Sequence, residues 1–141
     1  MRRSILLVGI SFLFFHRLPA LAFAATTASI AGSHIFYNNS FFDGFNPAAN
    51  PEDDRAIAPD KTALLPGQTA LFRNYTSYSK GINGVMVDIG NRTSLEAITS
   101  TDFEFRIGNS DDPSTWPLAP SPLSVTVRQG AGREGSDRVT L

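Results

Sequence analysis

The stretch VMVDI at residues 85–89 decides the fold class. Its β-branched residues Val85, Val87 and Ile89 share one face of an extended chain, because successive side chains of a strand point to opposite sides. A period of two, in place of the helical period of 3.6, predicts a β-strand here.

The same alternation recurs elsewhere in the chain. In DFEFRI at residues 102–107, the apolar side chains lie on one face and Asp102, Glu104 and Arg106 on the other. The stretch LSVTVR at residues 123–128 alternates in the same way. Further strands are predicted at residues 33–37, 68–75 and 138–141.

Turn signals rich in glycine and proline separate these strands, for example Pro66-Gly67 and residues 130–135. Short helical turns are compatible with residues 51–57 and 93–100, but no longer amphipathic helix is indicated. The sequence therefore predicts an all-β fold, an antiparallel β-sandwich of the jelly-roll or Ig-like type. Because the last strand ends almost where it begins, we expect a sandwich truncated at the C-terminus.

Residues 1–24 have the pattern of a secretory signal peptide. Arg2 and Arg3 precede an apolar run at residues 5–15, and Ala22-Phe23-Ala24 supplies the small residues of a cleavage site. We expect cleavage after Ala24, a single module at residues 25–141, and a secreted protein that is extracellular or at the cell surface.

The net charge of the mature chain limits the classes of partner it can bind, and its cysteine content limits how it can be stabilised. Without Arg2, Arg3 and Arg17, nine basic residues remain against 13 acidic ones, a formal charge of −4. This charge disfavours nucleic acid and anionic membrane surfaces, and we expect no membrane partner after signal cleavage. The chain has no cysteine, so its stability must come from apolar burial, with a metal or neighbouring domains as further stabilisers.

Catalytic residues are sparse in the predicted mature chain. A Ser-His-Asp hydrolase would have to use His34, and the sequence has no G-x-S-x-G motif. Asp102 and Glu104 are candidates for a glycosidase carboxylate pair, but with Arg106 they fit a solvated charged stripe better. The sequence favours a protein that is not an enzyme, and a glycoside hydrolase fragment is the least favoured reading.

Two sets of residues are candidate binding sites. The first is an acidic loop that offers oxygen ligands for calcium, although its spacing differs from that of an EF-hand and its side chains are equally suited to capping turns. The calcium candidates are Asp43, Asn50, Asp53, Asp54 and Asp60. The second set, Tyr75, Tyr78 and Trp116, is suited either to stacking on sugar rings or to packing in the core. Phe41, Phe42 and Phe45 are expected to anchor the acidic loop on the core.

Several long motifs resemble a known β-rich module. They are HIFYNNSFFDG, DDRAIAPDKTALLPGQTA, FRNYTSYSKGINGVMVDI, DFEFRIGN and VRQGAGREGSDRVTL. Together they resemble, over residues 33–141, a module of large secreted bacterial multidomain proteins that is often followed by dockerin-like calcium repeats. In that family the segment matching RVTL continues into further strands, which supports the expected truncation. The resemblance implies no established activity.

These observations together predict a non-catalytic secreted accessory module for adhesion, cell-surface or extracellular architecture. Its expected partners are polysaccharide and the neighbouring domains of a larger polypeptide. The alternative is a calcium-dependent binding domain.

Overall fold

The computed structural model describes residues 27–64, 68–92, 96–108, 110 and 112–141. The predicted signal peptide, its cleavage site and the turn at Pro66-Gly67 lie outside the described residues. None of the helices in the described ranges is long and apolar enough to cross a bilayer.

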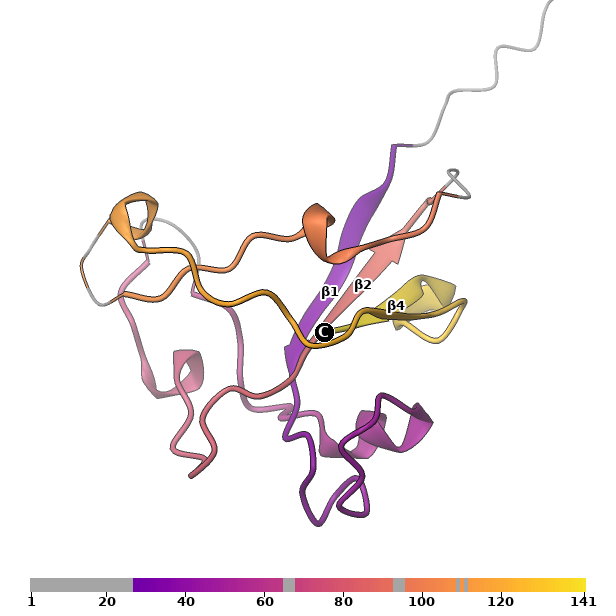
Figure 1. Ribbon diagram of the computed structural model, residues 1–141, viewed down its shortest axis with the longest axis horizontal. Coiled ribbons are helices and arrows are strands. Elements are labelled where there is room, and N and C mark those ends of the chain that lie inside the picture. Colours follow the sequence, from indigo (N-terminus) through magenta and orange to yellow (C-terminus); the bar gives the residue numbers. More distant parts are fainter. Residues whose placement is uncertain (1–26, 65–67, 93–95, 109, 111) are drawn as a thin grey trace, which may run out of the picture.

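One antiparallel sheet organises the described chain (Figure 1). Its four strands are β1 (Ser29–Ile35), β2 (Val85–Gly90), β3 (Thr126–Arg128) and β4 (Asp137–Thr140). The strand order is β1-β2-β4-β3, so β2 and β4 are central, whereas β1 and β3 are edges. A β-rich antiparallel fold is thus confirmed, and the second layer of a sandwich stays a prediction.

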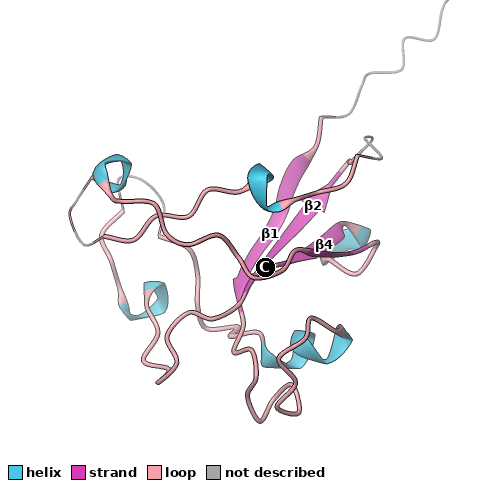
Figure 2. Cartoon of the chain, viewed as in Figure 1, coloured by secondary structure: helices cyan, strands magenta, loops and turns pink. Residues whose placement is uncertain are grey.

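The remaining regular structure consists of short 3₁₀ helices (Figure 2). Within the described ranges they are η1 (Pro51–Ala56), η2 (Phe72–Asn74), η3 (Ser100–Asp102), η4 (Pro113–Thr115) and η5 (Arg133–Gly135). The helical turn expected at residues 51–57 is confirmed as η1, which Asn50 caps by accepting the backbone N–H of Glu52. The turn considered at residues 93–100 begins in a part that the structure does not describe.

Strand prediction succeeded best for short segments that have a turn directly beside them. The strands predicted at residues 85–89 and 138–141 correspond to β2 and β4 within one residue at each end. The strand predicted at residues 33–37 is shifted: β1 begins earlier, at Ser29, and ends at Ile35, at an edge of the sheet. The strand predicted at residues 123–128 forms only from Thr126, and the Leu123 side chain is fully exposed.

Two predicted strands are wrong. Residues 68–75 contain the 3₁₀ turn η2, where the Asn74 side chain accepts the backbone N–H of Leu71. Residues 102–105 keep their alternation, because Phe103 and Phe105 are half-buried and Glu104 is exposed, but Ile107 is exposed as well. They form no strand, because the segment opposite them, residues 117–122, contains three prolines that lack the N–H groups a ladder requires.

The two faces of the sheet differ in polarity. Cross-strand pairing places Met86 beside Thr140 and Asp88 beside Arg138 on one face. On the other face, Val87 lies beside Val139. The β-branched residues of β2 do share a face, as predicted, but the fully buried positions of this strand are Met86 and Asp88.

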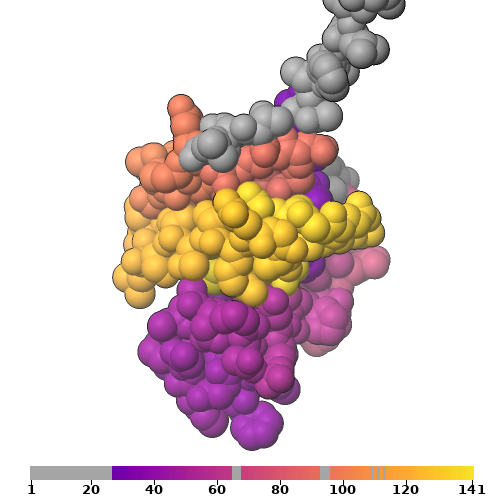
Figure 3. Space-filling view, turned by 90° about the vertical axis from the view of Figure 1, so that its right-hand side faces the viewer, coloured from indigo at the N-terminus to yellow at the C-terminus, as the bar shows by residue number. Residues whose placement is uncertain are grey.

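The main apolar cluster is small and lies against the face that carries Met86, while Val139 is fully buried on the opposite face. Its buried members Phe36, Ala56 and Met86 pack together, with Ile57 at their margin. Phe36 extends from β1 and is fixed there by its backbone N–H bond to Gly84 and by a bridge to Ile57. The space-filling view shows the C-terminal segment (yellow) between the orange segment above and the purple region below (Figure 3).

The close approach of the Phe36 ring to Gly84 gives a test of this core. A Cβ atom at Gly84 would lie 2.4 Å from Cε1 of Phe36, so the ring would have to leave its position. We expect Gly84→Ala to lower the free energy of unfolding by about 1–3 kcal/mol in urea denaturation. Gly90→Ala is the matched control, because its nearest neighbour is 3.6 Å away. Equal effects of the two substitutions would contradict this packing.

Candidate functional site

A fully buried carboxylate lies at the centre of the sheet. Asp88 accepts two hydrogen bonds from its cross-strand neighbour Arg138, Nε to Oδ1 and Nη2 to Oδ2, each at 2.8 Å. The backbone N–H of Arg133 donates to Oδ2 at 3.0 Å, and Nε2 of His34 lies 3.2 Å from the same oxygen. Asp88 is thus surrounded by donors from β1, β4 and η5.

The ion pair continues toward the helix η1. Nη1 of Arg138 lies 3.0 Å from Oδ1 of Asp54, and Nη1 of Arg128 donates to Oδ2 of Asp54 at 3.1 Å. Asp88, Arg138, Asp54 and Arg128 therefore form a chain of alternating charge that joins β2, β4, η1 and β3. We call these four residues the ion-pair chain.

Three members of the ion-pair chain, Asp88, Asp54 and Arg138, have shifted pKa values that keep them charged at neutral pH. The hydrogen bonds from Arg138 hold the pKa of Asp88 well below its usual range, against the opposing effect of burial. Burial alone would raise the pKa of Asp54, but the hydrogen bonds from Arg128 and Arg138 outweigh it and lower this pKa. The pKa of Arg138 is raised by its bond to Asp88. Asp88, Asp54 and Arg138 therefore act as permanent charges and not as proton donors or acceptors near pH 7.

The surroundings of Asp88 are closed by glycines. A Cβ atom at Gly132 would lie 2.7 Å from Cγ of Asp88, and one at Gly32 would lie 3.1 Å from its Oδ2. The backbone at both positions thus packs directly against the carboxylate. This arrangement is suited to holding strands together.

The predicted calcium ligands each have partners within the protein. Asp43 is buried and accepts the backbone N–H groups of Asn39, Ser40 and Phe45 at 2.6, 2.8 and 3.1 Å. It organises a loop and does not face an open site.

Asp53 and Asn50 form the reciprocal cap of η1. Asp53 Oδ2 accepts the backbone N–H of Asn50 at 2.8 Å, and burial raises the pKa of this carboxyl. Asp54 belongs to the ion-pair chain, and Asp60 is exposed beside Lys61. Across the described ranges, no group of three or more His, Cys, Asp or Glu side chains is arranged to hold a metal ion.

The structure corrects the position of three phenylalanines. Phe41, Phe42 and Phe45 were expected in the core, but 78, 58 and 65% of their surfaces are exposed. The reason is that Asp43 and Ser40 take the backbone N–H groups of the loop and thereby turn the three side chains outward.

The three predicted ligand-binding aromatics occupy different surroundings. Tyr78 is half-buried and packs on Tyr37, with 4.4 Å between ring centroids. Trp116 is half-buried against Gly108, and its Nε1 donates to Ser110 Oγ at 2.9 Å. Both rings thus have structural contacts.

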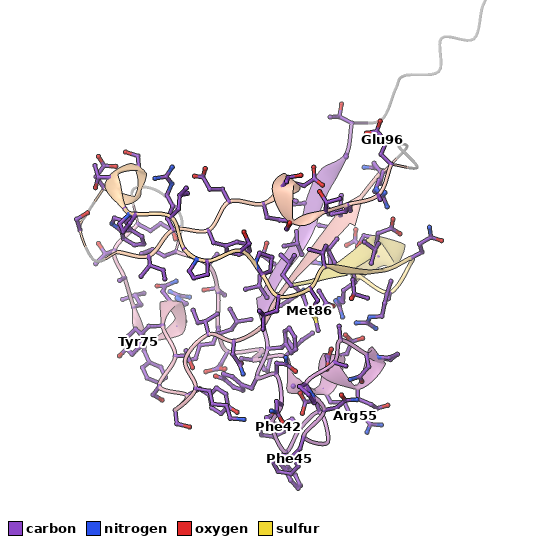
Figure 4. All side chains as sticks on the ribbon, in the orientation of Figure 1. Phe42, Phe45, Arg55, Tyr75, Met86 and Glu96 are labelled. Carbon is purple, nitrogen blue, oxygen red and sulfur yellow. The ribbon has the colours of Figure 1, made fainter. Side chains whose placement is uncertain are left out.

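Tyr75 is the exposed member of the three. It is 54% exposed, and its ring meets the ring of Phe72 edge to face at 5.2 Å. Phe72 is 61% exposed, and Nζ of Lys61 lies 3.9 Å from the centre of its ring. Figure 4 shows Tyr75 at the margin of the molecule, far from the labelled core residue Met86.

The turn that carries Tyr75 also borders an open groove. The groove has a volume of about 600 Å³ and is lined by Thr62, Ala63, Gln68, Thr69, Leu71, Arg73 and Asn74. Asn74 fixes its two sides, because Oδ1 accepts the Leu71 N–H and Nδ2 donates to the Thr62 carbonyl at 3.1 Å. Hydroxyl, amide and guanidinium groups therefore line a pre-formed surface.

Comparisons with family models, with curated proteins and with solved structures find no match. The resemblance to the β-rich bacterial module stays a prediction.

Sequence reasoning missed the ion-pair chain and the groove. Asp88 is a charged residue within the apolar strand at residues 85–89, and Arg138 is a charged residue of opposite sign within another predicted strand. Two such residues are a signal in the sequence for a buried ion pair. The groove carries no such signal, because it depends on how residues 62 and 74 approach one another.

The lowered pKa of Asp88 predicts acid sensitivity. The unfolded chain binds this proton more readily than the folded chain does, so the stability from Asp88 is complete above about pH 4 and is lost as the pH falls further. At neutral pH, Asp88→Asn should lower the free energy of unfolding by about 3–5 kcal/mol, since it leaves Arg138 buried without its charge partner. Urea denaturation across acidic pH measures both effects. Asp60→Asn should leave the curve nearly unchanged, and equal stability of wild type at about pH 3 and at neutral pH would contradict the role of Asp88.

The engagement of the acidic side chains by protein donors also predicts the response to chelation. Because Asp43, Asp53 and Asp54 already accept hydrogen bonds from the protein, removal of calcium with EDTA should leave the melting temperature unchanged. Differential scanning calorimetry with and without added calcium measures this. A lower melting temperature after chelation would support the calcium-dependent alternative.

Proposed function

We propose that this chain is a non-catalytic, secreted accessory module that contacts polysaccharide in extracellular or cell-surface structures. The contact surface is the groove lined by residues 62–63, 68–69, 71 and 73–74, together with the ring pair of Phe72 and Tyr75. The observation that supports this proposal most is an exposed aromatic pair on a turn whose neighbouring residues supply polar groups to an open groove.

This combination suits the chemistry of sugars. One face of a pyranose ring is apolar and stacks on an aromatic side chain, while its hydroxyl groups need donors and acceptors placed around it. Tyr75 supplies the exposed ring, and Thr62, Thr69 and Arg73 lie along the groove. The open shape of the groove fits a segment of a long chain.

The turn that carries Phe72 is held in place before any ligand binds. Lys61 lies over Phe72 and donates to its carbonyl, while Asn74 ties the turn to Thr62. The turn therefore loses little conformational freedom when a ligand binds, which improves affinity for a given set of contacts.

A glycan array of cell-wall and matrix oligosaccharides tests the proposal, followed by calorimetric titration of the strongest ligand. Tyr75→Ala should weaken binding about tenfold or more, as expected when an aromatic contact of roughly 1.4 kcal/mol is lost. Tyr75→Phe keeps the ring and should keep most of the affinity. Arg73→Ala should weaken binding by removing a donor from the groove.

Phe42→Ala is the matched control, since Phe42 is 58% exposed, close to the 54% of Tyr75, and lies in a different loop. It should leave glycan affinity unchanged. Absence of any glycan ligand, or equal affinity of wild type and Tyr75→Ala, would overturn the proposal.

A further inference from the structure

The loop of residues 38–47 presents three exposed aromatic rings at one end of the molecule. We call Phe41, Phe42 and Phe45 with their backbone the phenylalanine loop. Figure 4 shows Phe42 and Phe45 at the lower extremity of the protein, and Figure 3 shows the purple region as a lobe that extends beyond the C-terminal segment. The rings of Phe41 and Phe42 meet at 6.1 Å, and those of Phe41 and Phe45 at 6.4 Å, so they form a single cluster.

The exposure of these rings is built into the loop. The buried Asp43 carboxylate holds the backbone N–H groups of Asn39, Ser40 and Phe45, and the Ser40 carbonyl also accepts the Phe45 N–H at 2.7 Å. Phe45 has a φ of +58°, in the left-handed region that a bulky residue adopts only when its surroundings impose it. The hydrogen bonds of the loop hold Phe45 in this strained conformation, with its ring exposed.

The backbone of the loop is also largely satisfied from within. The Phe42 N–H bonds to Ser40 Oγ, and the Gly44 N–H bonds to the Phe41 carbonyl. At the base of the loop, Lys80 Nζ donates to the Asn39 carbonyl, and Asn83 donates to the Asn38 carbonyl. Entry into a hydrocarbon environment demands such internal pairing, because there is no water to replace it.

We propose that the phenylalanine loop inserts its rings into the interfacial region of a lipid surface with uncharged or zwitterionic headgroups. The exposed ring area is on the order of 400 Å². That is half of the roughly 800 Å² that each partner buries in a standard protein interface, so pairing with a second copy through this loop alone falls short of a stable dimer. A lipid surface needs no complementary pocket and accepts a convex apolar tip.

The charge of the protein selects the kind of lipid. The predicted mature chain carries a net negative charge, which disfavours anionic headgroups, whereas insertion of apolar rings does not depend on charge. The proposal thus replaces the expectation that the mature chain has no membrane partner, while it keeps the exclusion of anionic surfaces.

Flotation with vesicles tests the proposal. The full chain should float with vesicles of phosphatidylcholine, and the double substitution Phe41→Ser with Phe42→Ser should reduce the bound fraction about tenfold or more. Addition of phosphatidylglycerol should not increase binding. Leu123→Ser is the control because Leu123 is an exposed apolar residue outside the phenylalanine loop, and this variant should float like wild type. Urea denaturation of each variant verifies that it is folded.

Tyr75→Ala should leave flotation unchanged, so failure of the lipid proposal and failure of the glycan proposal are distinguishable. The lipid proposal is overturned if wild type stays unbound with phosphatidylcholine vesicles, if the double variant floats like wild type, or if binding requires phosphatidylglycerol. A dimer in lipid-free sedimentation that the double variant abolishes would identify a second copy as the occupant and would also overturn it.

Discussion

The buried pair of Asp88 and Arg138 is the constraint from which the remaining arrangement follows. Asp88 is wholly inaccessible to water, so its charge requires the guanidinium of Arg138 on the next strand. Arg138 in turn reaches Asp54, which ties η1 to the sheet. A shift of β4 by one residue would place Val139 opposite Asp88 and leave both charges buried without partners. The pair therefore specifies the register of the two central strands, whatever its net contribution to stability.

The same constraint explains why the apolar core is small. One face of β2 is occupied by Asp88 and by the backbone of Gly32 and Gly132, and this leaves Met86 to pack with Phe36 and Ala56. Large apolar side chains of the loops, such as Phe41, Phe45 and Phe72, lie outside this small core and are exposed. Polar side chains such as Asp43, Asn50 and Asn74 determine the loop conformations instead, through bonds to nearby backbone groups.

Sequence patterns predicted those elements whose pairing partners are equally regular. The central strands β2 and β4 were predicted because each alternates and has a turn close by. Residues 102–107 alternate just as well, but the prolines opposite them prevent a ladder, and the identity of that neighbour is not encoded locally. The placement of Phe41, Phe42 and Phe45 failed for a related reason. Hydrophobicity predicts burial, whereas the capture of three N–H groups by Asp43 determines the direction of the rings.

The two proposed contact surfaces use one structural device for different partners. In both, a polar side chain fixes an irregular backbone segment, Asn74 in the turn with Tyr75 and Asp43 in the phenylalanine loop. These side-chain bonds order both segments when the chain folds. The loss of conformational entropy therefore does not have to occur when a partner binds. The two surfaces differ in the residues that lie near the rings. The turn that carries Phe72 and Tyr75 adjoins a groove lined by polar side chains, whereas in the phenylalanine loop Ser40 and Asp43 are buried and bonded to backbone N–H groups beneath the three rings.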